Sequence, residues 1–99
     1  MTKTIWKFEA TIGGVITLPV GAQMLDIQVQ HGVPMIWALV DPDAAKADMH
    51  VSIYGTGHHL PDDPGRYIGT FQVQGGNLVF HAFAAPCHHM RGIRYETDL

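Results

Sequence analysis

The residues best suited to chemistry lie in one stretch, GTGHHLPDDPGRY at positions 55–67. Two glycines, Gly55 and Gly57, flank Thr56. A backbone of this kind can turn successive N–H groups toward an anion, since glycine adopts conformations that other residues avoid. The hydroxyl of Thr56 and the imidazole of His58 add side-chain donors to the same short segment. The first half of the stretch therefore has the chemistry of an anion site.

The second half of the stretch adds a cation and an aromatic ring. The guanidinium of Arg66 matches the geometry of phosphate or carboxylate, and the ring of Tyr67 can stack on a base or close a pocket. The stretch is not a Walker loop or a dinucleotide fingerprint, since it lacks the GK[ST] ending and no strand–helix unit follows. The alternative is a long connection whose glycine, proline and aspartate residues only turn the chain. We predict a ligand site for a small, anionic, nucleotide-like molecule, formed by Gly55, Thr56, Gly57, His58, Arg66 and Tyr67.

The chain holds seven histidines, which raises the question of a metal. The pairs His58-His59 and His88-His89, the second preceded by Cys87, supply ligand types that zinc accepts. Neighbouring residues on a strand point to opposite faces, however, and no HxH, HExxH or CxxC spacing occurs. We predict no metal and no cofactor, and interpret the histidines as surface imidazoles and oligomer contacts.

Nucleophilic catalysis has little support in the residues. Cys87 stands beside His88, but neighbours in sequence rarely form a thiolate–imidazole pair. The only serine, Ser52, lies in a strand pattern and lacks a Gly-x-Ser-x-Gly elbow. We predict no catalytic residues and expect that the protein is not an enzyme. A metallo-enzyme that uses histidines remains an alternative.

The elements that must position these residues are strands. Seven segments have the pattern of strands, most of them with apolar and polar residues alternating with period two, and none shows a helical stripe; the segments are 4–11, 15–18, 25–30, 35–40, 49–54, 67–74 and 78–84. Glycine turns predict hairpins at Gly13-Gly14, His31-Gly32 and Gly75-Gly76. This pattern predicts an all-β fold, a small antiparallel sandwich or barrel of about seven strands built from hairpins. We expect one β domain at 1–84 and a C-terminal tail at 85–99.

Two further patterns concern assembly and repetition. The segment 35–40 is apolar on both faces, so it is central in a sheet or at an interface, where Met35 and Trp37 are the expected contacts. The strings QVQHG at 28–32 and QVQGG at 72–76 each precede an apolar strand. Two structurally similar hairpins or convergent hairpin chemistry would produce them, and convergence is the simpler interpretation.

Composition limits the partners. Apolar residues make up 46% of the 99 residues and charged residues 15%, which excludes a disordered chain and favours a homo-oligomer that covers apolar surface. The net charge of −3 and the scattered lysines and arginines argue against duplex nucleic acid. No apolar run is long enough to cross a bilayer, and a single cysteine fits a reducing compartment, so we expect a cytoplasmic protein without membrane contact.

Four segments resemble a family of short proteins from phages and prophages to which no function is assigned. The similar segments are KTIWKFE (3–9), IQVQHGVPMIWALVDP (27–42), IYGTGHHLP (53–61) and RYIGTFQVQGGNLVFHAF (66–83). The family's GTGH segment corresponds to Gly55–His58, which marks this loop as its characteristic feature. The second histidine, His59, and the residues after Ala84 depart from the family pattern.

The resemblance implies a phage accessory protein. Phage proteins of this size often act against host pathways, and one version is an oligomeric sponge that sequesters a host nucleotide immune signal without cleaving it. This analogy gives our first expectation, a non-catalytic ligand-binding module in the host cytosol. The alternatives are a structural or protein-partner module, as part of a virion, a scaffold or a host-protein inhibitor, and the histidine-based metallo-enzyme.

Overall fold

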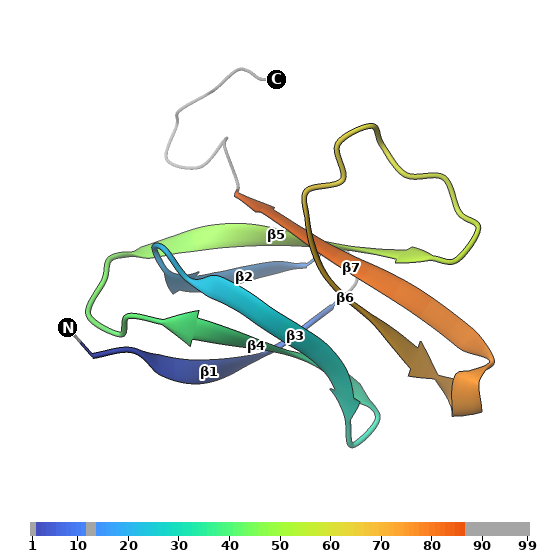
Figure 1. The fold of residues 1–99 in the computed structure, drawn as a ribbon, viewed down its shortest axis with the longest axis horizontal. Coiled ribbons are helices and arrows are strands. Elements are labelled where there is room, and N and C mark those ends of the chain that lie inside the picture. Colours follow the sequence, from blue (N-terminus) through green and yellow to red (C-terminus); the bar gives the residue numbers. More distant parts are fainter. Residues whose placement is uncertain (1, 12–13, 87–99) are drawn as a thin grey trace.

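The computed structural model describes residues 2–11 and 14–86. Seven strands lie in two antiparallel sheets, which confirms the predicted all-β fold of about seven strands (Figure 1). The strands are β1 (Thr4–Glu9), β2 (Val15–Pro19), β3 (Gln23–Gln30), β4 (Val33–Val40), β5 (Lys46–Gly55), β6 (Arg66–Val73) and β7 (Leu78–Pro86). A short 3-10 turn, Gln74–Gly76, joins the last two strands. In the described part of the chain, no helix is long and apolar enough to cross a membrane.

The two sheets share one pattern of strand order. Sheet A has the order β1-β4-β3, and sheet B has the order β2-β5-β7-β6. Apart from β2, each sheet has three strands, and the last of the three in the chain lies in the middle. β4 lies between β1 and β3, and β7 lies between β5 and β6. The strings QVQHG and QVQGG occupy matching places, because each ends an edge strand and enters the turn to a central strand. The two QVQ segments therefore belong to structurally similar hairpins.

The predicted hairpin at Gly13-Gly14 is wrong. β1 pairs with β4 and β2 pairs with β5, so the two strands lie in different sheets. Backbone hydrogen bonds show where the chain leaves one sheet for the other: the N–H of Ala10 donates to Pro34, whereas the carbonyl of Gly14 accepts from Val51. Glycines specify that the chain turns, but long-range pairing decides which strand it then joins. The hairpins at His31-Gly32 and Gly75-Gly76 are confirmed.

Irregular pairing changes which residues face inward on β3. The register shifts between Met24 and Asp26, so Leu25 is an extra residue relative to β4. Sequence alternation predicts that Leu25 faces the same side as Ile27, but Leu25 is 42% exposed and Met24 packs against the core. A second shift lies between Tyr67 and Gly69 on β6.

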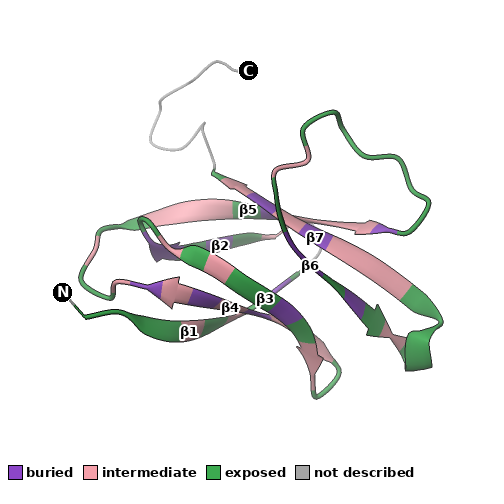
Figure 2. Ribbon diagram, viewed as in Figure 1, coloured by how far each residue is buried: buried purple, intermediate pink, exposed green. Residues whose placement is uncertain are grey.

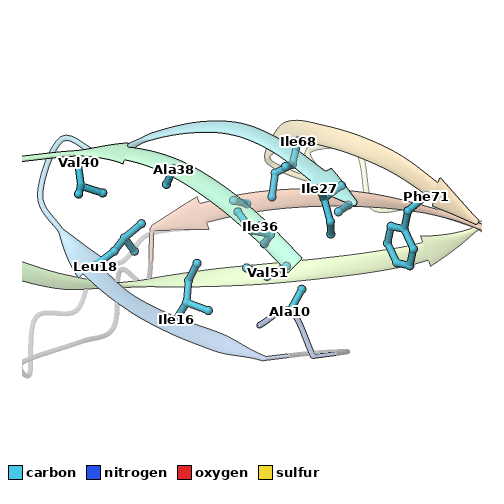
Figure 3. Close-up of a cluster of buried hydrophobic side chains, with 12 residues drawn as sticks. Ala10, Ile16, Leu18, Ile27, Ile36, Ala38, Val40, Val51, Ile68 and Phe71 are labelled. Carbon is cyan, nitrogen blue, oxygen red and sulfur yellow. The ribbon is translucent and has the colours of Figure 1, made fainter. Parts of the chain in front are cut away.

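The core lies between the two sheets. Its buried side chains come from both layers and point toward one another, as Figure 3 shows for Ile36 and Ala38 of sheet A and Val51 of sheet B. On β4, Ile36, Ala38 and Val40 have no exposed surface, while the residues between them are half-buried (Figure 2). Burial of this apolar face is the main force that holds the sheets together. The opposite face of β4 is apolar as well, and no part of the described chain buries it fully.

Candidate functional site

The segment Gly55–His58 forms a tight turn at the end of β5. The N–H of His58 donates to the carbonyl of Gly55 at 3.1 Å, and Gly57 has a positive φ of 88° that suits glycine. A side chain on Gly55 would meet the ring of His58, since the nearest ring atom lies 3.0 Å from the position of a Cβ. His58 therefore folds over Gly55, and both residues have a local structural role.

The side chain of Thr56 belongs to a chain of hydrogen bonds on the outer face of sheet B. Its Oγ1 lies 2.6 Å from Nε2 of His81, and Nδ1 of the same ring lies 2.9 Å from Oγ1 of Thr70. The hydroxyl of Tyr67 continues the chain at 2.5 Å from Thr70. We call these four residues, Thr56, Tyr67, Thr70 and His81, the hydroxyl–imidazole row. The row joins Thr56 and Tyr67, which the sequence predicts as ligand residues, through His81 and Thr70, which it does not.

One hydrogen-bond direction in the row is fixed. The carbonyl of Val79 can only accept, so the hydroxyl of Thr56 donates to it at 3.4 Å. The roles of Thr56 and Thr70 toward the two ring nitrogens of His81 depend on the tautomer of that ring. Between Tyr67 and Thr70 either hydroxyl can donate. Each group has its partner within the chain, so the row stabilises the exposed surface of the sheet.

Aromatic rings surround the row. The ring of Phe83 lies 5.9 Å from that of Tyr54 and 5.5 Å from that of Tyr67, measured between centroids. Phe83 pairs with Tyr67 and Ser52 on the outer face of sheet B, outside the buried cluster. Three rings and the row thus form one continuous polar–aromatic surface.

Replacing Thr70 by valine tests the structural role of the row. Thr70→Val removes the hydroxyl between Tyr67 and His81, and we expect the free energy of unfolding to fall by about 1 kcal/mol. Urea denaturation measures the change. Thr4→Val, the same substitution at an exposed residue of β1, is expected to stay within about 0.5 kcal/mol of the wild type. Equal effects of the two substitutions would show that the row contributes nothing to stability.

Arg66 lies away from this surface. Arg66 pairs with the inward-facing Ala84, whereas Tyr67 pairs with the outward-facing Phe83, because successive residues of a strand point to opposite faces. The backbone conformation of Gly65, the preceding residue, determines that β6 begins at Arg66. Gly65 has a φ of 102°, and its N–H donates to the carboxylate of Asp63 at 3.2 Å. The structure therefore separates Arg66 from the other predicted ligand residues.

Arg66 lines an open cavity of about 400 Å³ at one end of the sandwich. The cavity is lined by the turn after β2, the start of β3, one residue of β5, the start of β6 and the end of β7; its lining residues are Gly21, Ala22, Gln23, Met24, Met49, Arg66, Ala84 and Pro86. Four of these, Gly21, Ala22, Met49 and Pro86, also line a neighbouring hollow of about 200 Å³ that is walled mainly by apolar side chains. We call the first of these spaces the Arg66 cavity.

The Arg66 cavity combines one charge with apolar walls. Among the described residues, Arg66 is the one ionisable side chain that lines the cavity, and the amide of Gln23 adds a neutral donor and acceptor. Met24 and Met49 supply flexible apolar contacts. Such a site can hold a molecule with one anionic group and an apolar or planar body. Gln23, Met24 and Met49 carry no signal in the sequence, because only the packing of strand ends brings them together.

The predicted interface residues lie on the outer face of sheet A. Met35 and Trp37 alternate with the fully buried Ile36 and Ala38 along β4, and both are half-buried. β4 is the central strand of its sheet, as its apolar character predicts.

Across residues 2–11 and 14–86, no group of three or more histidine, cysteine, aspartate or glutamate side chains is placed to hold a metal ion. Cys87, His88 and His89, together with nearly all of the predicted tail at 85–99, lie outside the described residues.

Comparison with known proteins gives a family but no characterised relative. A family model with the description "Domain of unknown function (DUF7352)" matches residues 1–91. No curated protein and no solved structure is significantly similar to the chain.

Proposed function

The chain belongs to the DUF7352 family, and we propose that it is a non-catalytic phage accessory protein that binds a small anionic molecule in the Arg66 cavity. The observation that supports this proposal is that Arg66 lines a partly apolar cavity, and that no carboxylate is among the cavity's lining residues in the described part of the chain. A bound anion would pair with the guanidinium through two parallel hydrogen bonds. The rest of the ligand would replace water against Met24 and Met49.

The size of the cavity favours a nucleotide-like ligand. Small-molecule sites usually enclose about 300–1,000 Å³, and the Arg66 cavity is at the lower end of that range. A phosphate on Arg66 and a base between the methionines would use both parts of the cavity. In this proposal the protein acts in the host cytosol as a homo-oligomer, and sequesters a host nucleotide immune signal without cleaving it.

The other predicted ligand residues have a supporting place in this proposal. Gly55, Thr56, Gly57, His58 and Tyr67 do not line the Arg66 cavity. Gly55–His58 close the turn after β5, and Thr56 joins this turn to β7, the strand that supplies Ala84 and Pro86 to the cavity wall. Tyr67 bonds to Thr70 on β6. We therefore assign direct ligand contact to Arg66, with Gln23, Met24 and Met49.

Native mass spectrometry tests the proposal. We expect untagged protein from infected or signal-producing cells to have an added mass of nucleotide size, identified by comparison with the denatured mass. Arg66→Gln is expected to weaken binding of the released molecule at least about 10-fold by calorimetry, because a charge-assisted hydrogen bond contributes about 1.5–3 kcal/mol.

Lys3→Gln is the matched control, since it removes one positive charge from an exposed residue outside the cavity lining. The control should keep the added mass. Wild-type protein without any added mass, or Arg66→Gln protein that binds the molecule as tightly as wild type, would contradict the proposal.

A specific observation favours a second function, that of a protein-partner module. The outer face of β4 leaves Met35, Trp37 and Leu39 only half-buried, and such apolar surfaces commonly bind proteins. A virion or scaffold component would use this face. Detection of the protein in purified virions would favour this second function over the first.

A further inference from the structure

The backbone groups of β7 alternate between its two neighbouring strands. The N–H of Thr56 donates to the carbonyl of Val79, so Val79 directs its backbone groups toward β5. In an antiparallel sheet the next residue directs its groups to the other side, which here is β6. Phe80 therefore bonds to Phe71, the residue opposite it on β6. This pair fixes the alternation along the rest of β6.

Thr70 and Gln72 direct their backbone N–H and carbonyl groups away from β7. They stand on either side of Phe71, and β6 is an edge strand, so these groups reach the open edge of sheet B. No described backbone group outside β7 bonds to β6. An open hollow of about 330 Å³ lies beside this stretch; its lining residues are Gln28, Val29, Thr70, Phe71 and Gln72. Donors and acceptors in strand geometry are thus accessible at this edge.

The other edge strands carry features that oppose pairing with a further strand. β1 has a lysine in its middle, Lys7, and β2 is five residues long and ends in Pro19. On β3 the carboxylate of Asp26 accepts from the N–H of Ile27 and so occupies a backbone donor. Charges, prolines and short strands are the usual protection of a sheet edge. The regular stretch Gly69–Val73 of β6 has neither a charge nor a proline, so β6 is the edge at which pairing is expected.

A second copy of β6 matches the free groups in one register. A two-fold axis perpendicular to the sheet makes two β6 strands antiparallel. If the axis passes at Phe71, Thr70 lies opposite the partner's Gln72, and Gln72 lies opposite the partner's Thr70. Each of these two pairs exchanges two backbone hydrogen bonds, which uses every outward group of both residues in both copies.

Neighbouring registers leave outward groups without a match. With the axis at Thr70, Gln72 would face the irregular stretch between Tyr67 and Gly69 of the partner subunit. With the axis at Gln72, Thr70 would face the 3-10 turn that begins at residue 74. The backbone therefore selects both the partner, a second copy of the chain, and the register.

We propose that the open edge of β6 is a homodimer interface, in which Gly69–Val73 pairs antiparallel with the same stretch of a second copy about a two-fold axis at Phe71. Sheet B then continues from one copy into the other. This inference specifies the homo-oligomer of the proposed function and rests on that function in no other respect, because no residue of the paired stretch lines the Arg66 cavity. Sedimentation reports the dimer and added mass reports the ligand, so the two proposals can fail separately.

Replacing Gln72 by proline tests the backbone pairing. Proline lacks the N–H that Gln72 directs to the open edge, and β7 does not use this N–H, so a single copy should still fold. The dimer loses two of its four backbone hydrogen bonds, and each proline ring meets the partner strand. We expect sedimentation velocity to show a concentration-dependent dimer for the wild type, and a dissociation constant at least about 10-fold higher for Gln72→Pro.

Gln72→Ala is the matched control, since it removes the same side chain and keeps the N–H. Its dissociation constant should stay within about 3-fold of the wild-type value. Circular dichroism checks the fold of each variant. Folded Gln72→Pro protein that dimerises as tightly as the wild type would overturn the proposal, and so would wild-type protein that stays monomeric at millimolar concentration.

Pairs of cysteines test the register. Residues in a hydrogen-bonded antiparallel pair have Cα atoms about 5.5 Å apart, within the reach of a disulfide. On a Cys87→Ser background, we expect an equimolar mixture of Thr70→Cys and Gln72→Cys to form a disulfide-linked heterodimer under mild oxidation. Either variant by itself displaces its two cysteines by two residues along the strands, and should cross-link at least about 10-fold less.

The cross-linking decides the question even where Gln72→Pro does not fold. Non-reducing gel electrophoresis with a mass label on one variant distinguishes the heterodimer from the two homodimers. A mixture that cross-links no better than the single variants would contradict the proposed register and overturn the interface.

Discussion

Replacing Ile36 by alanine is expected to lower the free energy of unfolding by about 3–4 kcal/mol. Ile36 has no exposed surface and pairs with Phe8 on one side and Ile27 on the other. Its side chain points into the space between the sheets, where packed strands cannot close the resulting cavity (Figure 3). Small domains have about 5–15 kcal/mol of stability in total, so this single change removes a large part of it.

Urea denaturation of dilute protein measures this effect. Ile36→Val, which deletes one methylene, should cost about 1 kcal/mol. Ile5→Ala removes the same atoms from a residue that is 55% exposed, and should cost less than about 1 kcal/mol. If Ile36→Ala cost no more than Ile5→Ala, the sheets would not be packed as described.

Gly65→Ala is expected to be the most damaging glycine substitution in the 56–65 loop. The new Cβ would lie 2.7 Å from the carbonyl oxygen of Ala84, which is backbone and cannot move aside easily. The φ of 102° adds strain for any residue with a side chain. We expect a loss of about 2–4 kcal/mol, together with displacement of Arg66, the next residue.

Gly57→Ala is the matched control within the same loop. Gly57 has a positive φ of 88°, but nothing lies within 4 Å of its Cβ position, so its substitution costs strain without a clash, about 1 kcal/mol. The difference between the two variants in urea denaturation isolates the close approach of Gly65 to β7. Equal losses would contradict that approach.

The sequence predicts the strands well because alternation and turn chemistry are local. The hairpin at His31-Gly32 is an example: both residues have positive φ angles, 53° and 80°, which a two-residue turn requires. The partner of β2 is not a local property. Residues near Gly14 give no sign that Val51, far along the chain, will supply the next hydrogen bond.

The candidate site is predicted in part, for the same reason. Thr56 and Tyr67 lie close in sequence to the loop and are joined in the structure, but only through Thr70 and His81. Arg66 lines a cavity, but strand alternation sends it to the face opposite Tyr67, with which the sequence grouped it. Leu25 is likewise an extra residue relative to β4, so the residues at the start of β3 face the side opposite to the one that alternation predicts. No sequence pattern marks this extra residue.

The placement of β2 has a consequence for synthesis. Sheet A takes all its strands from residues up to Val40, whereas sheet B is complete only at Pro86. At about 5–20 residues per second, the ribosome needs roughly 2 to 9 s to make the segment between them. β2 has no partner strand until β5 has been made, and the inner side chains of β4 have no complete second sheet over them until the interval ends. The nascent chain thus presents the future core to chaperones, and to neighbouring chains, before it can bury it.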